Sequence, residues 1–224
     1  MYFVTGTDTD CGKTFISSAL LCKAASQGRA SLGLKPIASG CEETEQGLRN
    51  SDALSLIAQS TIELDYEQVN PVSFKPAIAP HIAAMQTSVD ISPDTVIKHL
   101  SPTLSLVNEA DFCLVEGAGG WRLPLGEGAF LSQAVQALSL PVILVVGVKL
   151  GCLNHAVLTQ EAILVDGLEI AGWVGNIVDA DTSCIEENLA SLHQLMSSPC
   201  LGVVPHLSNG SAEEAAKYLT ILLL

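Results

Sequence analysis

The sequence predicts an α/β fold, with a mostly parallel central sheet that helices cover on both faces. Three observations carry this prediction. Apolar, strand-like runs alternate along the chain with longer amphipathic runs, which is typical of strands joined by crossover helices. The run from Leu140 to Val148 contains no charged residue, as expected of a strand that is buried on both faces. The first apolar run leads directly into a glycine-containing turn and then a helical pattern.

The elements follow one another in this alternating order. The expected strands cover residues 2–5, 31–35, 111–116, 141–147, 170–176 and 199–204. The expected helices cover residues 13–27, 51–60, 93–108, 130–139, 153–166, 183–197 and 211–223.

Local chemistry marks several of these boundaries. Gly28 and Gly167 directly follow two predicted helices, where glycine commonly ends a helix. Ser92 precedes Pro93, which is the order found at helix starts. Residues 61–91 carry several prolines and are the least regular region. Because no repeat, low-complexity tract or linker divides the chain, residues 1–224 are expected to form one domain.

Composition restricts the function. The formal net charge is −14, from 10 Lys+Arg against 24 Asp+Glu, which opposes binding to nucleic acid or to an anionic membrane surface. The apolar run 140–148 is shorter than the roughly 20 residues that a membrane-spanning helix needs. The N-terminus has no export-signal pattern. The seven cysteines form no C-x-x-C pair, so we expect neither a disulfide framework nor a zinc site, and a reducing cytoplasm is the simple interpretation.

The segment from Gly6 to Thr14 has the residues of a phosphate-binding loop. It lies between a predicted strand and a predicted helix, so that backbone N–H groups and the helix N-terminus favour an anion. Lys13 would reach the outer phosphates, and the Thr14 hydroxyl would bind Mg²⁺. The usual pattern is G-x-x-x-x-G-K-[ST], but here five residues separate Gly6 from Gly12. The alternative is a chance strand–turn–helix that contains Gly-Lys-Thr.

Three charged residues are candidates for the same site. Glu116 follows a buried apolar strand and precedes the small residues 117–120, which let backbone approach a ligand. Asp52 lies in the first turn of a predicted helix. Lys35 ends the second strand, and open α/β sheets bind ligands at the carboxyl ends of their strands. The structural alternatives are a solvated strand-end carboxylate, an ordinary first-turn acid and a lysine that extends to solvent.

Taken together, these residues resemble the dethiobiotin synthetases, an ATP-dependent family of the P-loop NTPase superfamily. The resemblance extends over nearly the whole chain and includes the family's own five-residue spacing in the phosphate loop. The segments that carry it are 2–9, Gly12-Lys13-Thr14, 35–40, 47–54, 115–121, 141–155, 171–174 and Asn176.

The resemblance implies a P-loop NTPase fold and a cytoplasmic, homodimeric, Mg-ATP-dependent ligase of biotin synthesis. In this family, 7,8-diaminopelargonate, CO2 and ATP give dethiobiotin, ADP and phosphate. One amine takes up CO2 as a carbamate, and ATP phosphorylates the carbamate to a mixed anhydride. The second amine then closes the ring and releases phosphate.

The resemblance also implies a role for each candidate residue. Lys13 and Lys35 would be catalytic, stabilising the transferred phosphoryl group, and Lys35 would also hold the carbamate. The Mg²⁺ ligands would be Thr14, Asp52 and Glu116. The ATP-binding set would be Asp10, Cys11, Gly12, Lys13, Thr14, Phe15, Asp52, Glu116, Gly117, Ala118, Gly119, Asn176, Ile177, Pro205, His206 and Leu207. The substrate set would be Thr9, Lys35 and Ser39, with Lys149, Gly151, Cys152, Leu153 and Asn154 contributed at a helix N-terminus by the other subunit.

Four of these positions depart from the family pattern. Asp10 stands where glutamate is common, Cys11 where valine is common, and Ile177 where an acidic residue is frequent. His206 replaces an aromatic residue in the loop that packs on the base, while Asn176 keeps the amide that would read the adenine edge. Cys11 lies beside a helix N-terminus, which lowers thiol pKa values, but we favour the interpretation that it only fills the valine space.

Three other functions remain open from the sequence. A regulatory ATPase switch, such as the partitioning and septum-placing ATPases, would carry a second lysine early in the phosphate loop, where this chain has residues 7–10 without one. A related P-loop synthetase would act on another carboxylic acid. A non-catalytic binding module would have no need for Lys13, Lys35 and the three Mg²⁺ candidates together.

Overall fold

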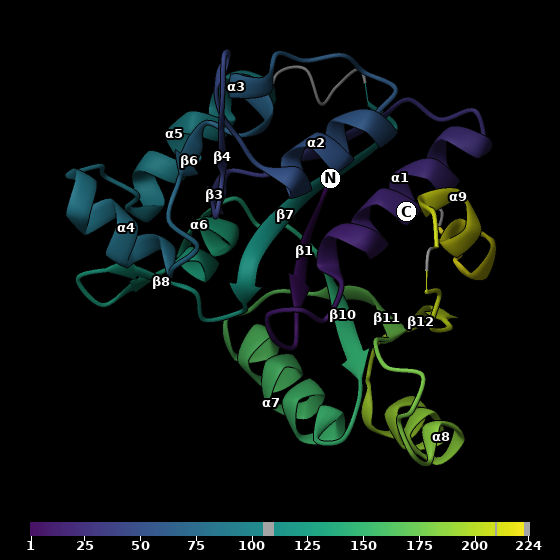
Figure 1. Ribbon diagram of the computed structural model, residues 1–224. Coiled ribbons are helices and arrows are strands. Elements are labelled where there is room, and N and C mark those ends of the chain that lie inside the picture. Colours follow the sequence, from purple (N-terminus) through teal and green to yellow (C-terminus); the bar gives the residue numbers. More distant parts are fainter. Residues whose placement is uncertain (105–109, 209, 222–224) are drawn as a thin grey trace.

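The computed structural model describes residues 1–104, 110–208 and 210–221. Its centre is a six-stranded sheet of β1 (Tyr2–Gly6), β2 (Ser31–Leu34), β7 (Phe112–Gly120), β10 (Val142–Val148), β11 (Ile170–Ile177) and β12 (Cys200–Val204). The strand order is β12-β11-β10-β1-β7-β2, and every neighbouring pair is parallel (Figure 1). All six predicted strands are therefore confirmed, and their carboxyl ends share one edge of the sheet.

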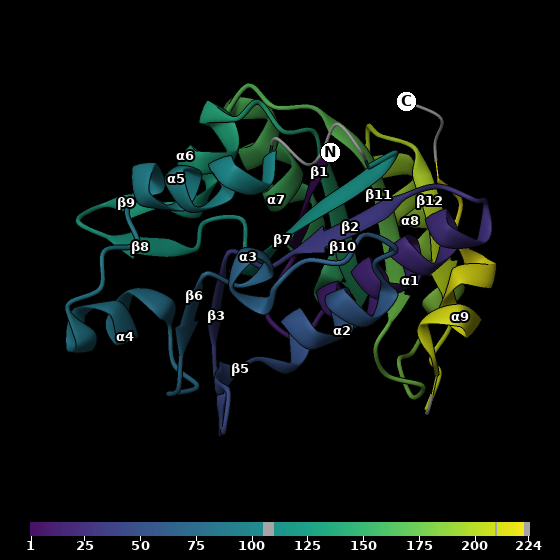
Figure 2. The same ribbon diagram turned by 90° about the horizontal axis from the view of Figure 1, so that it is seen from above.

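Helices cover the two faces of the sheet. One face carries α1 (Lys13–Ser26), α2 (Ser51–Gln59) and α9 (Ala212–Ala215), and the other carries α5 (Pro93–Leu104), α6 (Leu131–Ala137) and α7 (Cys152–Val165), with α8 (Ile185–Leu195) beside α7 (Figure 2). The strand β10 shows why both faces are apolar. Val142, Leu144 and Val146 pack into one core cluster, whereas Ile143 and Val145 pack into the other, because successive side chains of a strand point to opposite faces.

Short elements outside the central sheet were not predicted. They are β3 (Ile37–Ser39), β4 (Glu42–Thr44), β5 (Gly47–Arg49), α3 (Tyr66–Val69), β6 (Val72–Phe74), α4 (Pro80–Thr87), β8 (Pro124–Gly126), β9 (Ala129–Phe130) and a 3-10 turn at Ala216–Tyr218. The strand β3 pairs with β6, β4 with β5, and β8 with β9. The region 61–91, predicted to be the least regular, contains α3, β6 and α4.

The helix boundaries agree with the predictions except near the C-terminus. Gly28 and Gly167 have φ of 75° and 78° directly after helices, and α5 begins at Pro93 as predicted. Residues 105–108 of that predicted helix lie outside the described residues.

The predicted helix 211–223 is wrong beyond its first turns. The regular helix ends at Ala215, and Leu219 forms an antiparallel bridge with Gly202. The Thr220 N–H donates to Leu201 O at 2.8 Å, so pairing with β12 replaces helical hydrogen bonds there. Residues 222–224 lie outside the described part.

Two expectations from composition concern the whole molecule. All seven cysteines lie in the described ranges and are free, as expected. Among the described helices, none has the length and apolarity that crossing a membrane requires.

Candidate functional site

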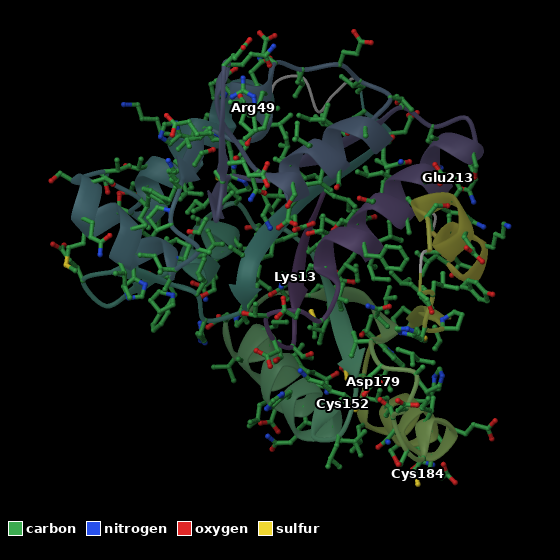
Figure 3. All side chains as sticks on the ribbon, viewed as in Figure 1. Lys13, Arg49, Cys152, Asp179, Cys184 and Glu213 are labelled. Atoms are coloured by element: carbon green, nitrogen blue, oxygen red, sulfur yellow. The ribbon has the colours of Figure 1, made fainter. Side chains whose placement is uncertain are left out.

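The phosphate-binding loop joins β1 to α1, with Lys13 at the junction (Figure 3). Gly12 has φ 85°, and a Cβ at this position would lie 2.2 Å from the Asn176 side-chain nitrogen. Both the conformation and the close approach therefore require glycine. The Lys13 Nζ donates to Asp8 O at 3.2 Å, so the lysine folds back along its own loop.

The additional residue of the loop is accommodated by burying one side chain and exposing another. Cys11 is 1% exposed, and a Cβ at Gly6 would lie 2.2 Å from its sulfur. The thiol thus packs under the loop, which is the space-filling role that the sequence favoured. Asp10 is exposed and has φ 59°, a left-handed conformation that aspartate tolerates better than most residues.

Four predicted residues meet beside the carboxyl end of β2, with Glu116 contributed from within β7. The Lys35 Nζ donates to Glu116 Oε1 at 2.6 Å and to Gly117 O at 3.0 Å, and it lies 3.2 Å from Asp52 Oδ2. The Thr14 hydroxyl donates to the same Glu116 oxygen at 2.7 Å. The contact follows from sheet register, because Leu34 of β2 is paired with Val115 of β7 and the next residues along both strands are Lys35 and Glu116.

Lys35 is a buried cation held by two carboxylates. It is 3% exposed and Glu116 is 0% exposed. Burial disfavours the charged lysine and is the largest single influence, but Glu116 and Asp52 together outweigh it and hold the pKa of Lys35 above its ordinary value. Lys35 therefore carries a full positive charge at neutral pH, and it neither extends to solvent nor acts as a base there.

This raised pKa predicts how stability depends on pH. Protonated Lys35 stabilises the fold below the ordinary lysine value of 10.5, and that stabilisation is lost only as pH rises through the still higher folded-state pKa. The difference in unfolding free energy between the protein and Lys35→Met should therefore not shrink until pH passes about 10. Urea unfolding at a series of pH values measures this difference in unfolding free energy. Lys75→Met is the control, because the Lys75–Glu43 ion pair is exposed. A difference that already shrinks near neutrality would contradict the prediction.

The carboxylate and hydroxyl oxygens fit a hard divalent cation. Glu116 Oε2 is buried and has no hydrogen-bond partner within the described chain, so a lone pair of a buried carboxylate is left for another ligand. Asp52 is partly exposed, at 41% of its side chain. Among the described residues, no group of three or more His, Cys, Asp or Glu side chains is placed to hold a metal. One hydroxyl and two carboxylates nevertheless suit Mg²⁺, which usually keeps several waters and substrate phosphates as ligands.

A cleft of about 780 Å³ lies over these residues. Predicted residues that line it are Thr9, Asp10, Gly12, Lys13, Thr14, Phe15, Lys35, Ser39, Asp52, Ala118 and Gly119. Gly117 contributes a carbonyl to Lys35 just beneath. The Ser39 hydroxyl oxygen is buried and has no hydrogen-bond partner in the described chain. The size is typical of a small-molecule site.

Sequence reasoning missed the apolar side of this cleft and one cap. The missed lining residues are Ala38, Asn50, Ala77, Ile78, Ala79, Pro80 and Leu123. Asn50 caps α2, because its side-chain oxygen accepts from the Asp52 and Ala53 N–H groups at 3.1 and 3.2 Å. The Asn-Ser-Asp order could have revealed this cap, whereas nothing in Ala77–Pro80 distinguishes it from an ordinary loop.

The residues assigned to the base and to the other subunit lie outside the lining of this cleft. Asn176 is 6% exposed, and its Nδ2 donates to Cys11 O at 3.0 Å, so it supports the phosphate loop. Ile177 ends β11, and residues 205–207 follow β12. Lys149 Nζ lies 3.7 Å from Asp8 Oδ2. Gly151, Cys152, Leu153 and Asn154 form the start of α7, where Cys152 is buried (Figure 3).

Solved structures with the same fold are P-loop proteins of another class. A chain of the MinC:MinD cell division protein complex of Aquifex aeolicus has a TM-score of 0.55 at 15% identity, over 92% of this chain and 81% of that one. The septum site-determining protein MinD of Pyrococcus horikoshii OT3, complexed with Mg-ADP, has a TM-score of 0.54 at 18% identity, over 96% and 86%. At such identities the likeness supports the fold alone, and it confirms the predicted P-loop NTPase architecture.

Relatives found by sequence have a much higher identity to this chain than these solved structures do. A family model described as an AAA domain matches residues 1–214. The ATP-dependent dethiobiotin synthetase BioD of Cellvibrio japonicus is 56% identical over 98% of this chain and 95% of the relative. The protein of the same name from Pseudomonas paraeruginosa is 53% identical over 98% and 96%, and that from Vibrio parahaemolyticus is 44% identical over 98% and 95%. The chain therefore belongs to the ATP-dependent dethiobiotin synthetase family.

Proposed function

We propose that this enzyme converts 7,8-diaminopelargonate, CO2 and ATP into dethiobiotin, ADP and phosphate. Membership of the family makes the chain an ATP-dependent dethiobiotin synthetase with ATP as a co-substrate. The observation that best supports the chemistry is the buried Lys35 ammonium, fixed by Glu116 at 2.6 Å and Asp52 at 3.2 Å. It lines the same cleft as Lys13 of the phosphate loop. Two cations in one cleft of a chain with net charge −14 suit a reaction between anions.

The reaction needs charge stabilisation at two stages. One amine of the substrate adds to CO2 and loses a proton, which gives a carbamate. The carbamate oxygen displaces ADP from the γ-phosphorus, and the second amine then attacks the carbamoyl carbon and expels phosphate. Lys13 neutralises charge on the transferred phosphoryl group. Lys35 holds the carbamate against the γ-phosphate, so that proximity adds to charge stabilisation.

Mg²⁺ would be held by Thr14, Asp52 and Glu116 together with phosphate oxygens. The unpartnered, buried Glu116 Oε2 supports this assignment, since such an atom is costly to bury unless it serves a ligand. When bound, Mg²⁺ neutralises phosphate charge and fixes the orientation of the β- and γ-phosphates. Thr9 and Ser39, which also line the cleft, would offer hydroxyls to the diamine and carbamate.

The unpredicted wall of Ala77, Ile78, Pro80 and Leu123 matches the alkyl chain of the proposed substrate. A chain of methylene groups gains affinity by leaving water for an apolar surface.

We further propose a homodimer in which Lys149–Asn154 of one subunit binds the substrate carboxylate of the other. In the first turn of α7, the Cys152 N–H donates to Lys149 O at 3.0 Å, whereas the N–H groups of Leu153 and Asn154 lack intrahelical partners, which suits a carboxylate. Exposed apolar residues around α7 support an interface, because Leu150 is 97%, Leu158 55% and Val165 84% exposed. Large exposed apolar side chains on one helix and its N-terminal turn are consistent with a protein contact.

Subunit mixing tests the shared site. Lys35→Ala removes a residue of one half-site, and Leu153→Pro removes an N–H donor near the start of α7, where proline is tolerated. Each variant alone should be nearly inactive. If sites combine residues of two subunits, a refolded equimolar mixture should recover about a quarter of the wild-type activity, because half the dimers carry one intact site. A mixture that stays as inactive as its components, or a fully active monomer, would contradict the shared site.

The reaction itself is tested by ADP release with Mg-ATP and bicarbonate, with and without 7,8-diaminopelargonate. We expect release to depend on the diamine and to match dethiobiotin formation. ATP turnover that is indifferent to the diamine would indicate a regulatory ATPase, and binding of Mg-ATP without turnover on the diamine would indicate a synthetase for another carboxylic acid.

A further inference from the structure

Tyr66, the first residue of α3, connects the two segments that carry Lys35 and Asp52. Its hydroxyl accepts a hydrogen bond from the Asn50 N–H at 2.7 Å and donates one to Asn70 Oδ1 at 2.8 Å. Both hydrogen-bonding functions of the hydroxyl are therefore used between two buried asparagines, Asn50 at 4% and Asn70 at 2% exposed.

Each asparagine makes further hydrogen bonds to one side of the candidate site. The Asn70 Nδ2 donates to Lys35 O at 2.6 Å, which holds the main chain at the end of β2. The Asn50 side-chain oxygen accepts the Asp52 N–H at 3.1 Å, which fixes the first turn of α2. The Asn50 Nδ2 also reaches Ser39 O at 3.4 Å. The Tyr66 hydroxyl oxygen is thus shared by a series of hydrogen bonds that runs from Lys35 through Asn70, Tyr66 and Asn50 to Asp52.

The ring of Tyr66 is itself fixed from the other side. The Arg49 guanidinium carbon lies 4.1 Å from the ring centroid, and Arg49 also pairs with Glu67 at 3.3 Å. Arg49 ends the β4–β5 hairpin, away from Lys13 and the phosphate loop (Figure 3). Stacking of this kind restricts the ring, so the hydroxyl has a defined position relative to both asparagines.

We propose that the Tyr66 hydroxyl is a positioning group, which sets the distance between Lys35 and Asp52 that Mg²⁺-dependent phosphoryl transfer requires. The Lys35–Asp52 ion pair at 3.2 Å has one partly exposed member and does not by itself define the geometry. The geometry is instead defined by the buried hydrogen bonds that join Asn70, Tyr66 and Asn50, since satisfied polar networks in a low-dielectric interior are rigid. The inference rests on the proposed roles of Lys35 and Asp52.

Tyr66→Phe tests the inference, because it removes the hydroxyl and keeps the ring. We expect kcat to fall about 10- to 100-fold, as small displacements of reacting groups do, while KM for ATP changes less than about threefold. The Mg²⁺ concentration for half-maximal ATP binding, measured by calorimetry, should rise. Tyr2→Phe is the matched control, since Tyr2 begins β1, at the end of the strand away from the phosphate loop, and its ring contacts Phe112. This variant should change neither kcat nor the Mg²⁺ requirement.

A second variant separates positioning from simple stabilisation. In an Asp52→Asn background, adding Tyr66→Phe should raise the Mg²⁺ requirement little further, because groups that act through one another are not additive. A Tyr66→Phe enzyme that unfolds at a lower urea concentration but keeps its kcat and its Mg²⁺ requirement would overturn the inference. Effects of Tyr66→Phe and Asp52→Asn on the Mg²⁺ requirement that are fully additive would overturn it as well. If the wild-type enzyme released no ADP in response to the diamine, the proposed function would fail, yet Mg²⁺-dependent ATP binding would still decide the role of Tyr66.

Discussion

Lys35→Ala should bind ATP nearly as well as the wild-type enzyme and turn over about 10²- to 10³-fold more slowly, a loss of roughly 3 to 4 kcal/mol in transition-state stabilisation. In the proposed mechanism, ATP affinity depends mainly on the phosphate loop and Lys13, which the substitution does not touch. Lys35 is proposed to act where the carbamate meets the γ-phosphate, so its charge should matter most during transfer. Calorimetric ATP binding and kcat from diamine-dependent ADP release measure the two effects separately.

The substitution also leaves Glu116 buried without its cation. Removing one member of a buried pair costs roughly 3 to 5 kcal/mol of stability, so the activity assay must be preceded by urea unfolding. Lys35→Arg keeps the charge but not the point-like ammonium. This variant should be more stable than Lys35→Ala, and its turnover should still be slower than that of the wild-type enzyme. Unchanged turnover in a folded Lys35→Ala enzyme would remove Lys35 from the mechanism.

The central sheet could be predicted because its strands carry a strong, local signal. Buried parallel strands are apolar on both faces, as in β10, and such runs stand out from the amphipathic helices between them. The two- and three-residue strands around the cleft carry no such periodicity. At the C-terminus, Leu219 satisfies a helical pattern locally but bridges Gly202 instead, so tertiary pairing overrode local propensity.

The charged part of the candidate site could be predicted for a geometric reason. Lys35 directly follows β2 and Glu116 lies one residue beyond Val115, the β7 partner of Leu34, so the parallel register brings the two side chains together near the edge where such sheets bind ligands. Tyr66 and three of the four wall residues, Ala77, Ile78 and Pro80, belong to residues 61–91, whose short elements take their positions from tertiary contacts. A tyrosine in a region predicted to be irregular has no sequence feature that distinguishes two buried hydrogen bonds from solvent exposure, so its role required the structure.

Glu116→Gln should raise the Mg²⁺ concentration for half-maximal activity by at least about 10- to 100-fold, the range found when even the hydrogen-bonding partners of metal ligands are altered. The side chain keeps its size, and its remaining oxygen can still accept from Thr14 and Lys35. What it loses is the negative charge and the second oxygen, Oε2, which is buried without a partner within the described chain. A hard cation is the ligand most sensitive to that loss.

Magnesium titrations of activity and of ATP binding provide the measurement, and Glu43→Gln provides the control. Glu43 pairs with Lys75 at the surface, where both side chains are exposed, and its neutralisation should leave both titrations unchanged. The two titrations of Glu116→Gln should shift together, because the metal binds with the nucleotide phosphates. An unaltered Mg²⁺ response would place the ion elsewhere, and Glu116 would then serve only as the buried counter-ion that keeps Lys35 protonated.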